Sequence, residues 1–443
     1  MLFKRKVYDE LLKWKNTWHG KYAVLLEGAR RVGKTTIAEA FARQEYQSYI
    51  LVDFSSASDE LLDVFSDLND LDRFFLRLQA VTSVNLVERN SLIIFDEVQL
   101  FPKARQAIKH LVKDGRYDYI ETGSWISIQK NVRDILIPSE EMKINVYPMD
   151  YEEFMWAQGR NADLLKKMAE MNEPIGDTAN KTLMRDLRIY MAVGGMPQAV
   201  DTYLTANNID AVDKVKKDIL RLYGDDISKI DPSGRMSAMY SSIPAQLALK
   251  KNHFVIPSAT GKQKTRKDSE RILDLIDSKL ILPCWHVNNP AESLQLSRDP
   301  DRFKLYLSDT GLLTTMLYDG GHGANSDIYI KLLSNTFDTS PGCLYENVVA
   351  QMLTARGYEL YYHTWRKEDT NTYHTIDFLL SDHAKLIPLE VRSSRVTNHS
   401  SIDAFCKKYS HFIADQYLIS QKDIGNQQML KMRPFYLVPF LKF

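Results

Sequence analysis

The stretch Gly28-Ala29-Arg30-Arg31-Val32-Gly33-Lys34-Thr35 decides the fold of the first part of this chain. It fits the phosphate-binding pattern G-x-x-x-x-G-K-[ST] (Walker A) at every fixed position. The two glycines permit a tight turn and let the backbone approach a polyphosphate closely. Lys34 can place its charge on the β- and γ-phosphates, and Thr35 can offer its hydroxyl to Mg²⁺.

The segments on either side of this loop argue against a chance match. Residues 22–27 are an apolar run, as expected of a buried parallel strand. Residues 36–43, beginning with Thr36, read as an amphipathic helix, whose positive N-terminus favours an anion. The order of strand, loop and helix therefore predicts that residues 28–36 bind ATP with Mg²⁺.

A second apolar run, residues 91–97, ends in two acids, Asp96 and Glu97. A phosphate-binding loop needs a carboxylate near Mg²⁺ at the carboxyl end of a neighbouring strand, and Asp96 fits that role. Glu97 follows where the strand gives way to a loop and could polarise the attacking water, so Glu97 and Lys34 are the expected catalytic residues. Without the loop, the same pattern usually marks a plain strand end.

Further strands are expected over residues 48–53, 117–122 and 143–147, with helices over 70–89 and 104–114. Strands that alternate with helices predict an α/β domain with a parallel sheet covered on both faces. Ligands sit beyond the carboxyl ends of such strands. Thr122 or Ser124, at the end of one strand, is therefore a candidate sensor of the γ-phosphate, with a simple turn as the equal alternative.

Composition is typical of a multidomain cytoplasmic protein. A chain of 443 residues is too long for one core, and 57 basic against 57 acidic residues give no global attraction to nucleic acid or membrane. The three cysteines are far apart, which suits a reducing compartment. Neither a signal segment nor an apolar run of membrane-spanning length is evident, so no membrane partner is expected.

These motifs, with residues 147–154, 193–200, 303–313 and 345–350, resemble a prokaryotic ATPase family over nearly the whole chain. Its members join an AAA-superfamily P-loop domain to a C-terminal domain of unknown function. The resemblance implies ATP binding, a helical lid, a winged-helix-like middle and a C-terminal fold similar to PD-(D/E)XK nucleases. Relatives often carry a Gly-Arg pair before the fifth strand, where this chain has residues 139–142; Arg133 could replace that arginine or be a solvated surface residue.

Breaker clusters and the resemblance together suggest four domains. They are a P-loop ATPase domain over 1–157, a helical lid or connector over 158–235, a winged-helix-like domain over 236–320 and a nuclease-like domain over 321–443. A helix over 182–192 is expected to stop at the turn residues Gly194 and Gly195.

The third of these domains carries a basic run from Lys250 to Arg271, ahead of a helix and a predicted hairpin over 280–285 and 303–307. Such a run could bind the phosphate backbone of DNA. A solvated loop or a site for a protein partner is the alternative.

The last domain offers a second cluster of acids. Glu346 lies on an apolar helix, Asp377 on a strand, and Glu390 and Arg392 two apart on the next strand, so the last two share a face. This resembles the nuclease signature Asp…Glu-x-Lys, with arginine in place of lysine. Because arginine stays protonated and is bulkier, the site is expected to be degenerate, its acids and arginine forming a buried ion pair.

The sequence as a whole predicts a Mg²⁺-dependent ATPase whose nucleotide state controls C-terminal DNA- or protein-interaction domains. Two alternatives stay open. One is an ATP-gated binding switch with negligible turnover, and the other is a nuclease that uses the C-terminal acids.

Overall fold

The glycine-rich loop follows a fully buried strand in a five-stranded parallel sheet of the computed structural model. The sheet order is β2-β3-β4-β1-β5. Every residue of β1, β3 and β4 is buried, as expected of inner strands covered on both faces. The strands are β1 (Ala23–Glu27), β2 (Ser48–Asp53), β3 (Ser91–Asp96), β4 (Asp118–Gly123) and β5 (Glu141–Asn145).

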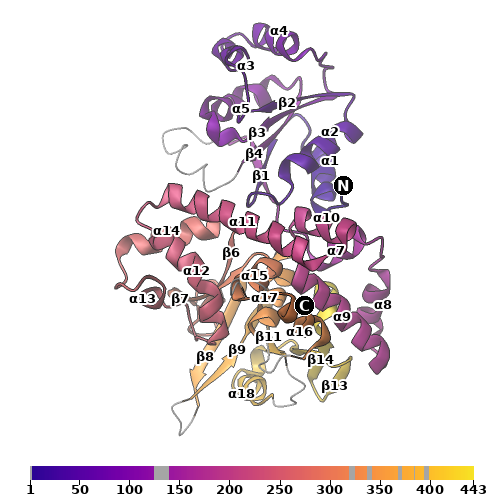
Figure 1. Cartoon of the computed structure of the whole chain (residues 1–443), viewed down its shortest axis with the longest axis vertical. Coiled ribbons are helices and arrows are strands. Elements are labelled where there is room, and N and C mark those ends of the chain that lie inside the picture. Colours follow the sequence, from indigo (N-terminus) through magenta and orange to yellow (C-terminus); the bar gives the residue numbers. More distant parts are fainter. Residues whose placement is uncertain are drawn as a thin grey trace. The chain divides into compact units, whose positions relative to one another are not determined.

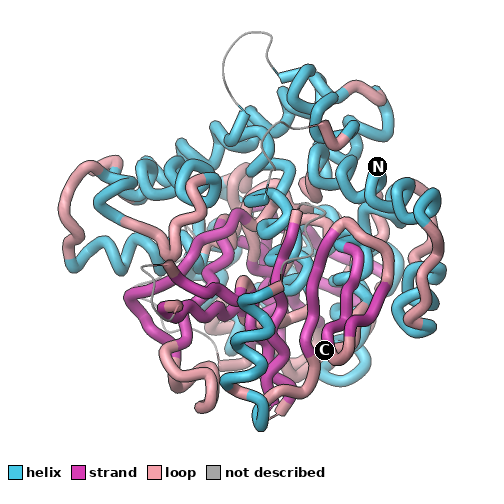
Figure 2. The backbone as a smooth tube through the Cα atoms, turned by 90° about the horizontal axis from the view of Figure 1, so that it is seen from below, coloured by secondary structure: helices cyan, strands magenta, loops and turns pink. Residues whose placement is uncertain are grey.

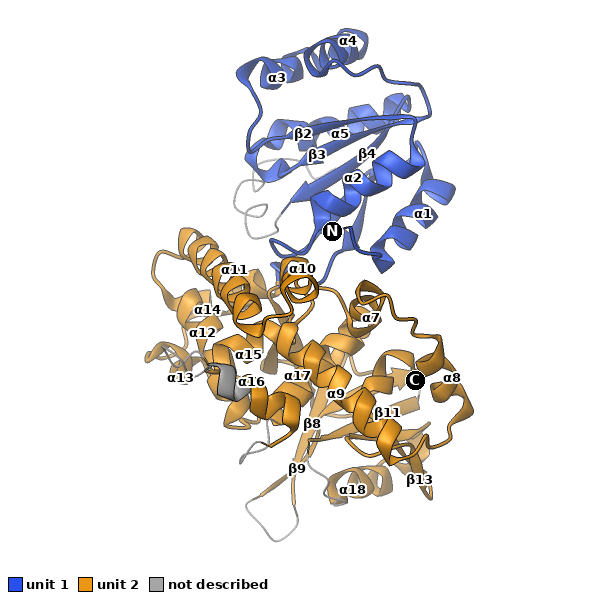
Figure 3. Ribbon diagram, turned by 45° about the vertical axis from the view of Figure 1, so that its right-hand side comes forward, with its two compact units in different colours: residues 1–147, 277–279 blue, residues 148–276, 280–443 orange. Residues whose placement is uncertain are grey.

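The chain splits into two compact units, shown in Figure 3. Unit 1 comprises residues 1–147 and 277–279, and unit 2 comprises residues 148–276 and 280–443. The structure describes residues 2–123, 139–318, 325–336, 342–367, 372–383, 385–393 and 399–443.

The two faces of the unit 1 sheet are covered by different helices (Figure 3). Alternate strand residues such as Leu25 and Phe95 join Ile108 of α5 in one apolar core. Helix α2 packs against β2, β3 and β4. The helices of this unit are α1 (Lys6–Trp18), α2 (Lys34–Glu45), α3 (Asp59–Val64), α4 (Leu71–Thr82) and α5 (Pro102–Asp114), with short 3-10 helices η1 (Phe65–Asp67) and η2 (Val98–Leu100). The α/β sandwich thus holds the loop at the carboxyl edge of the sheet.

The helix expected over 70–89 is shorter than predicted. Helix α4 ends at Thr82 because Ser83 takes the left-handed conformation, with φ of 54°. The chain then turns back, and the amide of Leu86 donates to the side-chain oxygen of Gln79 at 2.8 Å. No glycine or proline marks this end in the sequence, so the polar composition alone did not reveal it.

Unit 2 begins with a helical region, seen with its strands in Figures 1 and 2. The helices of unit 2 as a whole are α7 (Tyr151–Ala157), α8 (Asp163–Met171), α9 (Asp177–Val193), α10 (Pro197–Ala206), α11 (Ile209–Ile230), α12 (Arg235–Ala248), α13 (Ile256–Thr260), α14 (Arg266–Asp277), α15 (Thr310–Tyr318), α16 (Asn325–Ser334), α17 (Gly342–Ala355) and α18 (Ser400–Lys408). Helix α9 ends at Gly194, as the sequence predicts.

Two mixed sheets complete unit 2. A four-stranded sheet has the order β7-β6-β8-β9, and a five-stranded sheet has the order β10-β11-β12-β14-β13. The strands are β6 (Ile281–Val287), β7 (Arg298–Leu307), β8 (Leu360–Arg366), β9 (Tyr373–Ile376), β10 (Phe378–Asp382), β11 (Lys385–Arg392), β12 (Gln416–Ser420), β13 (Gly425–Gln427) and β14 (Leu430–Pro434), with 3-10 helices η3 (Ser410–Phe412) and η4 (Phe435–Phe440). The predicted hairpin is β6 and β7, which continues into a sheet because β6 also pairs in parallel with β8.

Candidate nucleotide-binding site

The glycine-rich loop connects β1 to α2 in a conformation that its two glycines make possible. Gly33 caps α2 with φ of 95°, a left-handed conformation that favours glycine. A Cβ on Gly28 would lie 2.2 Å from the carbonyl oxygen of Val146, which is backbone and cannot swing away. Ala29 and Val32 are buried, whereas Arg30, Arg31 and Thr36 are exposed, and Arg31 is left-handed with φ of 66°. The backbone conformation of the loop therefore depends on Gly28 and Gly33 and is formed before any ligand binds.

The ammonium group of Lys34 is hydrogen-bonded to the backbone of the loop. Its side chain is buried and donates to the carbonyl oxygens of Gly28 at 3.0 Å and Ala29 at 2.9 Å. Burial lowers the pKa of Lys34 from 10.5 to about 8, although the carboxylates of Glu97 and Asp96 oppose the shift. The cation is thus held in the loop by neutral carbonyls, and a polyphosphate would offer it much stronger acceptors.

Thr35, Asp96 and Thr122 meet at the carboxyl ends of three strands, β1, β3 and β4, and at the N-terminus of α2. Strand β4 lies between β1 and β3, and the pairing places Leu26 beside Thr122 and Phe95 beside Glu121. The Thr35 hydroxyl donates to Asp96 Oδ1 at 2.7 Å, and the Thr122 hydroxyl donates to the same oxygen. The structure therefore places Thr122 as a buried partner of Asp96. Ser124 and Arg133 lie outside the described residues.

The Thr35 and Asp96 pair fits a magnesium ion. Mg²⁺ is commonly held by one or two oxygen ligands of the protein, with the phosphates and water completing its shell. No group of three His, Cys, Asp or Glu side chains suited to a metal occurs among the described residues, and a magnesium ion carried in with ATP does not need one.

Glu97 follows β3 in a left-handed conformation, with φ of 55°, which is unusual for a residue other than glycine. The buried side-chain amide of Gln99 donates to its carboxylate. This contact orients a carboxylate one residue beyond Asp96, where the sequence predicts the group that polarises water.

Arg5 also contacts the glycine-rich loop, although nothing in the sequence predicts this contact. Its guanidinium is buried and donates to the carbonyl oxygen of Val32 at 2.9 Å and to that of Tyr147 at 2.7 Å. Arg5 therefore ties the loop to the last residues of unit 1. In the sequence it stands between Lys4 and Lys6, which gives no local signal of burial.

The C-terminal acids also come together, in unit 2. Arg392 is ion-paired with Glu390 and lies 3.9 Å from Asp377. Asp377 also accepts from the amide of Val391 at 2.8 Å, and Glu390 accepts from the amide of Ile402 at 3.2 Å. These acids are thus already satisfied by a guanidinium and by backbone amides, which does not fit a second magnesium ion.

Glu346 pairs with a different cation, which the sequence analysis missed. Lys304 Nζ of β7 lies 3.7 Å from Glu346 Oε2, and the Tyr306 hydroxyl donates to the same oxygen at 3.3 Å. Burial raises the pKa of Glu346, with Lys304 opposing the shift. The available signal was a lone lysine inside the apolar run of residues 303–307.

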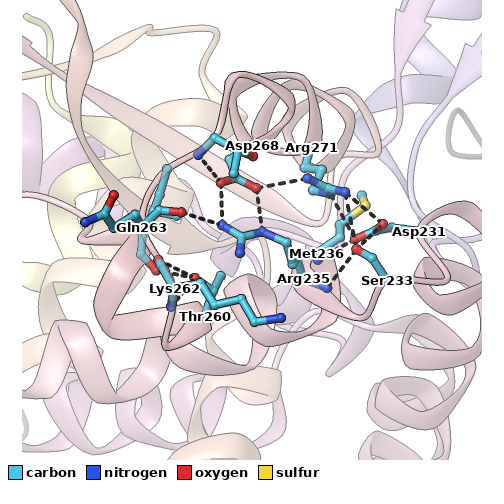
Figure 4. A network of polar contacts seen from close by, with 11 residues as sticks. Asp231, Ser233, Arg235, Met236, Thr260, Lys262, Gln263, Asp268 and Arg271 are labelled. Carbon is cyan, nitrogen blue, oxygen red and sulfur yellow. Dashed lines mark hydrogen bonds and ion pairs between the residues drawn. The ribbon is translucent and has the colours of Figure 1, made fainter.

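The basic run from Lys250 to Arg271 is less free than its composition suggests. Arg271 lies 3.0 Å from Asp231 and 3.0 Å from Asp268, and Figure 4 shows these contacts. Arg235 is also paired with Asp268. Burial opposes the shift, but hydrogen bonds from Arg235 and Thr265 lower the pKa of Asp268. Lys264 lies 2.6 Å from Asp301. Part of the predicted DNA-binding charge is therefore neutralised within unit 2.

The composition also led to expectations about membrane-spanning segments and about the cysteines. None of the described helices has both the length and the apolar character needed to cross a bilayer. The cysteines Cys284, Cys343 and Cys406 are free thiols.

Comparison with protein families divides the chain into three matched segments. Residues 20–155 match a family model described as an AAA domain. Residues 184–322 and 341–433 match models described as domains of unknown function, DUF8612 and DUF4143. No curated protein matches the chain. The segment that resembles an AAA domain thus lies mostly in unit 1.

Solved structures that match parts of the chain include a Walker-type ATPase of Pyrococcus abyssi, with 16% identity and a TM-score of 0.41 over 71% of this chain and 96% of that one. AMPPCP-bound DnaA from Aquifex aeolicus has 11% identity and a TM-score of 0.29 over 63% and 80%. The RuvB Holliday junction branch migration motor of Thermotoga maritima has 14% identity and a TM-score of 0.27 over 63% and 89%.

Proposed function

We propose that unit 1 binds MgATP at residues 28–36 and hydrolyses it. The observation that carries this proposal is the meeting of Lys34, Thr35 and Asp96 at one edge of the sheet, with Glu97 one residue further on. A P-loop ATPase needs a cation on the phosphates, a hydroxyl and a carboxylate for the metal, and a group that orients water. The chain supplies each of these.

Each residue has a defined part in this chemistry. Lys34 exchanges the carbonyls of Gly28 and Ala29 for phosphate oxygens. Thr35 and Asp96 would hold magnesium, which would neutralise charge on the phosphates. Glu97 accepts a hydrogen bond from the attacking water and withdraws its proton as the bond from the water oxygen to the γ-phosphorus forms. The bond between that phosphorus and the β,γ-bridging oxygen breaks at the same step, so that ADP and phosphate are the products. Thr122 keeps Asp96 in place.

We further propose that the nucleotide state is passed to unit 2 through the end of unit 1. Arg5 binds both the loop, at Val32, and the carbonyl oxygen of Tyr147. Val146 lies against Gly28, and Pro148 is the first residue of unit 2. A change in loop conformation on binding or hydrolysis would therefore act directly on the connecting segment. DNA or a protein would be the partner that unit 2 binds or releases.

Phosphate release and nucleotide affinity, measured on the same preparation, test the enzymatic part of this proposal. An ATPase releases phosphate continuously with MgATP and stops when EDTA removes the metal. A binding switch would show tight MgATP binding with no release beyond one equivalent, and that result would reject turnover.

The pH dependence of MgATP binding should report the proton on Lys34. Its pKa is about 8 in the free protein, and bound phosphate requires the charged form. Affinity is thus expected to be constant below pH 8. Above it, binding must take up a proton, so the dissociation constant should rise towards tenfold per pH unit. Titration calorimetry at several pH values measures this. Lys34→Arg, which stays charged, should bind with no such rise.

The nuclease alternative is disfavoured by the contacts of Arg392. The guanidinium neutralises Glu390 and lies near Asp377, so a metal would have to displace it. We predict that the wild-type protein shows no Mg²⁺- or Mn²⁺-dependent nicking of a plasmid. Arg392→Lys should be neutral or gain activity. Strong cleavage by the wild type that is lost in Asp377→Ala would overturn this prediction.

A further inference from the structure

A cavity of about 500 Å³ in unit 2 gathers cations from distant parts of the chain. Helices α12 and α17 pack against each other and against β7, and α17 also packs against β11 (Figure 1). The lining residues come from these elements, from β9, from the start of α18 and from the residues that directly follow α12, β8 and β9. They are Leu247, Lys250, Lys251, Asn252, Lys304, Glu346, Lys367, Tyr373, Thr375, Asp377, Arg392, Ser400 and Ser401.

The charge of this cavity is strongly positive although the whole chain is neutral. Five lining residues are lysine or arginine, and only two are acidic. Both carboxylates already have a cation beside them, since Lys304 lies near Glu346 and Arg392 near Asp377. The positive excess therefore belongs to the remaining lysines, Lys250, Lys251 and Lys367.

These three lysines have donors to offer. Within the part of the chain that the structure describes, none of their ammonium groups makes a hydrogen bond or an ion pair. Lys250 and Lys251 are exposed at the end of α12, and Lys367 is half-buried after β8. Like charges gathered around a concave surface repel one another, so an anion bound there would relieve that repulsion as well as gain hydrogen bonds.

The other lining groups suit phosphate rather than a metal. Hydroxyls of Thr375, Ser400 and Ser401 are typical donors to phosphate oxygens. A metal would compete with Lys304 and Arg392 for Glu346 and Asp377, the two acids among the described residues that line the cavity. Tyr373 is 51% exposed at the same cavity and presents an aromatic face on which a base can stack.

We propose that this cavity binds the phosphate groups of a nucleic-acid strand without a metal ion, through Lys250, Lys251 and Lys367. Lys304 and Arg392 act as positioning residues that neutralise Glu346 and Asp377, so that these acids do not repel the strand. Residues 262–271 do not line this cavity, and part of their predicted DNA-binding charge is paired internally. It does not depend on ATP hydrolysis in unit 1.

Fluorescence anisotropy with a dye-labelled oligothymidylate, in EDTA and low salt, tests this assignment. The full chain is used with Lys34→Ala in every sample, so that the glycine-rich loop does not contribute. Replacing Lys250, Lys251 and Lys367 with glutamate should weaken binding at least about tenfold and lower the slope of log affinity against log salt by about 2.

The matched control replaces Lys262, Lys264 and Lys267 with glutamate. These lysines are also exposed, lie outside the cavity and give the same change in charge. A loss in the control as large as that in the cavity variant would overturn the assignment, as would unchanged binding by the cavity variant. Competition by AMP or inorganic phosphate tests whether the phosphate groups that the cavity binds belong to a strand or to a free small molecule. Displacement by AMP at the same nucleotide concentration as the oligomer assigns the cavity to a free nucleotide, and its failure assigns it to a strand.

A second variant makes the opposite change without touching the lysines. Glu346→Gln keeps the shape of the side chain and an oxygen that can accept from Tyr306, but removes a negative charge from the cavity. Binding of the oligomer should become tighter, about threefold or more. Weaker binding would show that Glu346 is needed for the ligand, as in a metal site, and would contradict the proposal.

Discussion

Glu97→Gln is expected to lose ATP hydrolysis by about 100- to 1,000-fold while keeping MgATP affinity within a few-fold of wild type. A general base typically contributes 10²- to 10⁴-fold to a reaction rate. The amide of glutamine is similar in shape to the carboxylate but cannot withdraw a proton from water. Because Lys34, Thr35 and Asp96 are untouched, the phosphates and metal should still bind. Steady-state phosphate release and titration calorimetry give the two quantities.

The control for this variant is Glu60→Gln, the same substitution on α3 of unit 1 at an exposed position. Its hydrolysis rate should equal that of the wild type. If the Glu97→Gln protein hydrolysed ATP at the wild-type rate, Glu97 would have no role in hydrolysis. The trapped ATP-bound form would also serve to capture the partner of unit 2.

Arg5→Met is expected to destabilise unit 1 by about 3 kcal/mol. The substitution keeps much of the apolar stem but removes two hydrogen bonds from a charged group, each worth about 1.5–3 kcal/mol, and leaves two carbonyl oxygens without their donor. Hydrogen exchange of the amides in residues 23–45 reports this stability directly. The rise in exchange should be largest in the loop, because Val32 is one of the two partners.

Arg43→Met is the matched control, since the side chain of Arg43 is 63% exposed on α2 of the same unit. Its effect should stay within about 0.5 kcal/mol. Equal exchange in the two variants would show that Arg5 does not hold the loop, and the proposed route from the loop to Tyr147 would fail with it.

The parts of the fold that were predictable from sequence are those fixed by neighbouring residues. The apolar runs of β1, β3 and β4 are continuous because these strands are buried on both faces. The glycine-rich loop and the stop of α9 at Gly194 are likewise local, since a left-handed conformation there favours glycine. The two-residue period of β11 correctly placed Glu390 and Arg392 together.

The residues that escaped prediction act over long separations. Arg5 binds carbonyls 27 and 142 residues away, and Lys304 pairs with Glu346 on another element. Arg5 looks like an ordinary surface cation in the sequence, and the apolar run around Lys304 does not identify its partner. Arg271 shows the converse, because its partner Asp231 lies 40 residues earlier and was not counted against the basic run. Pairing of charges across a fold depends on tertiary contacts that local composition does not encode.

The most direct test of the central claim is the stability of unit 1 with and without MgATP, in the wild type and in Lys34→Ala. At a hundredfold excess over the dissociation constant, binding should add about 2.7 kcal/mol to the free energy of unfolding. Lys34→Ala should lose most of this gain, because the ammonium group that binds the phosphates is gone. An equal gain in both proteins would contradict nucleotide binding at residues 28–36.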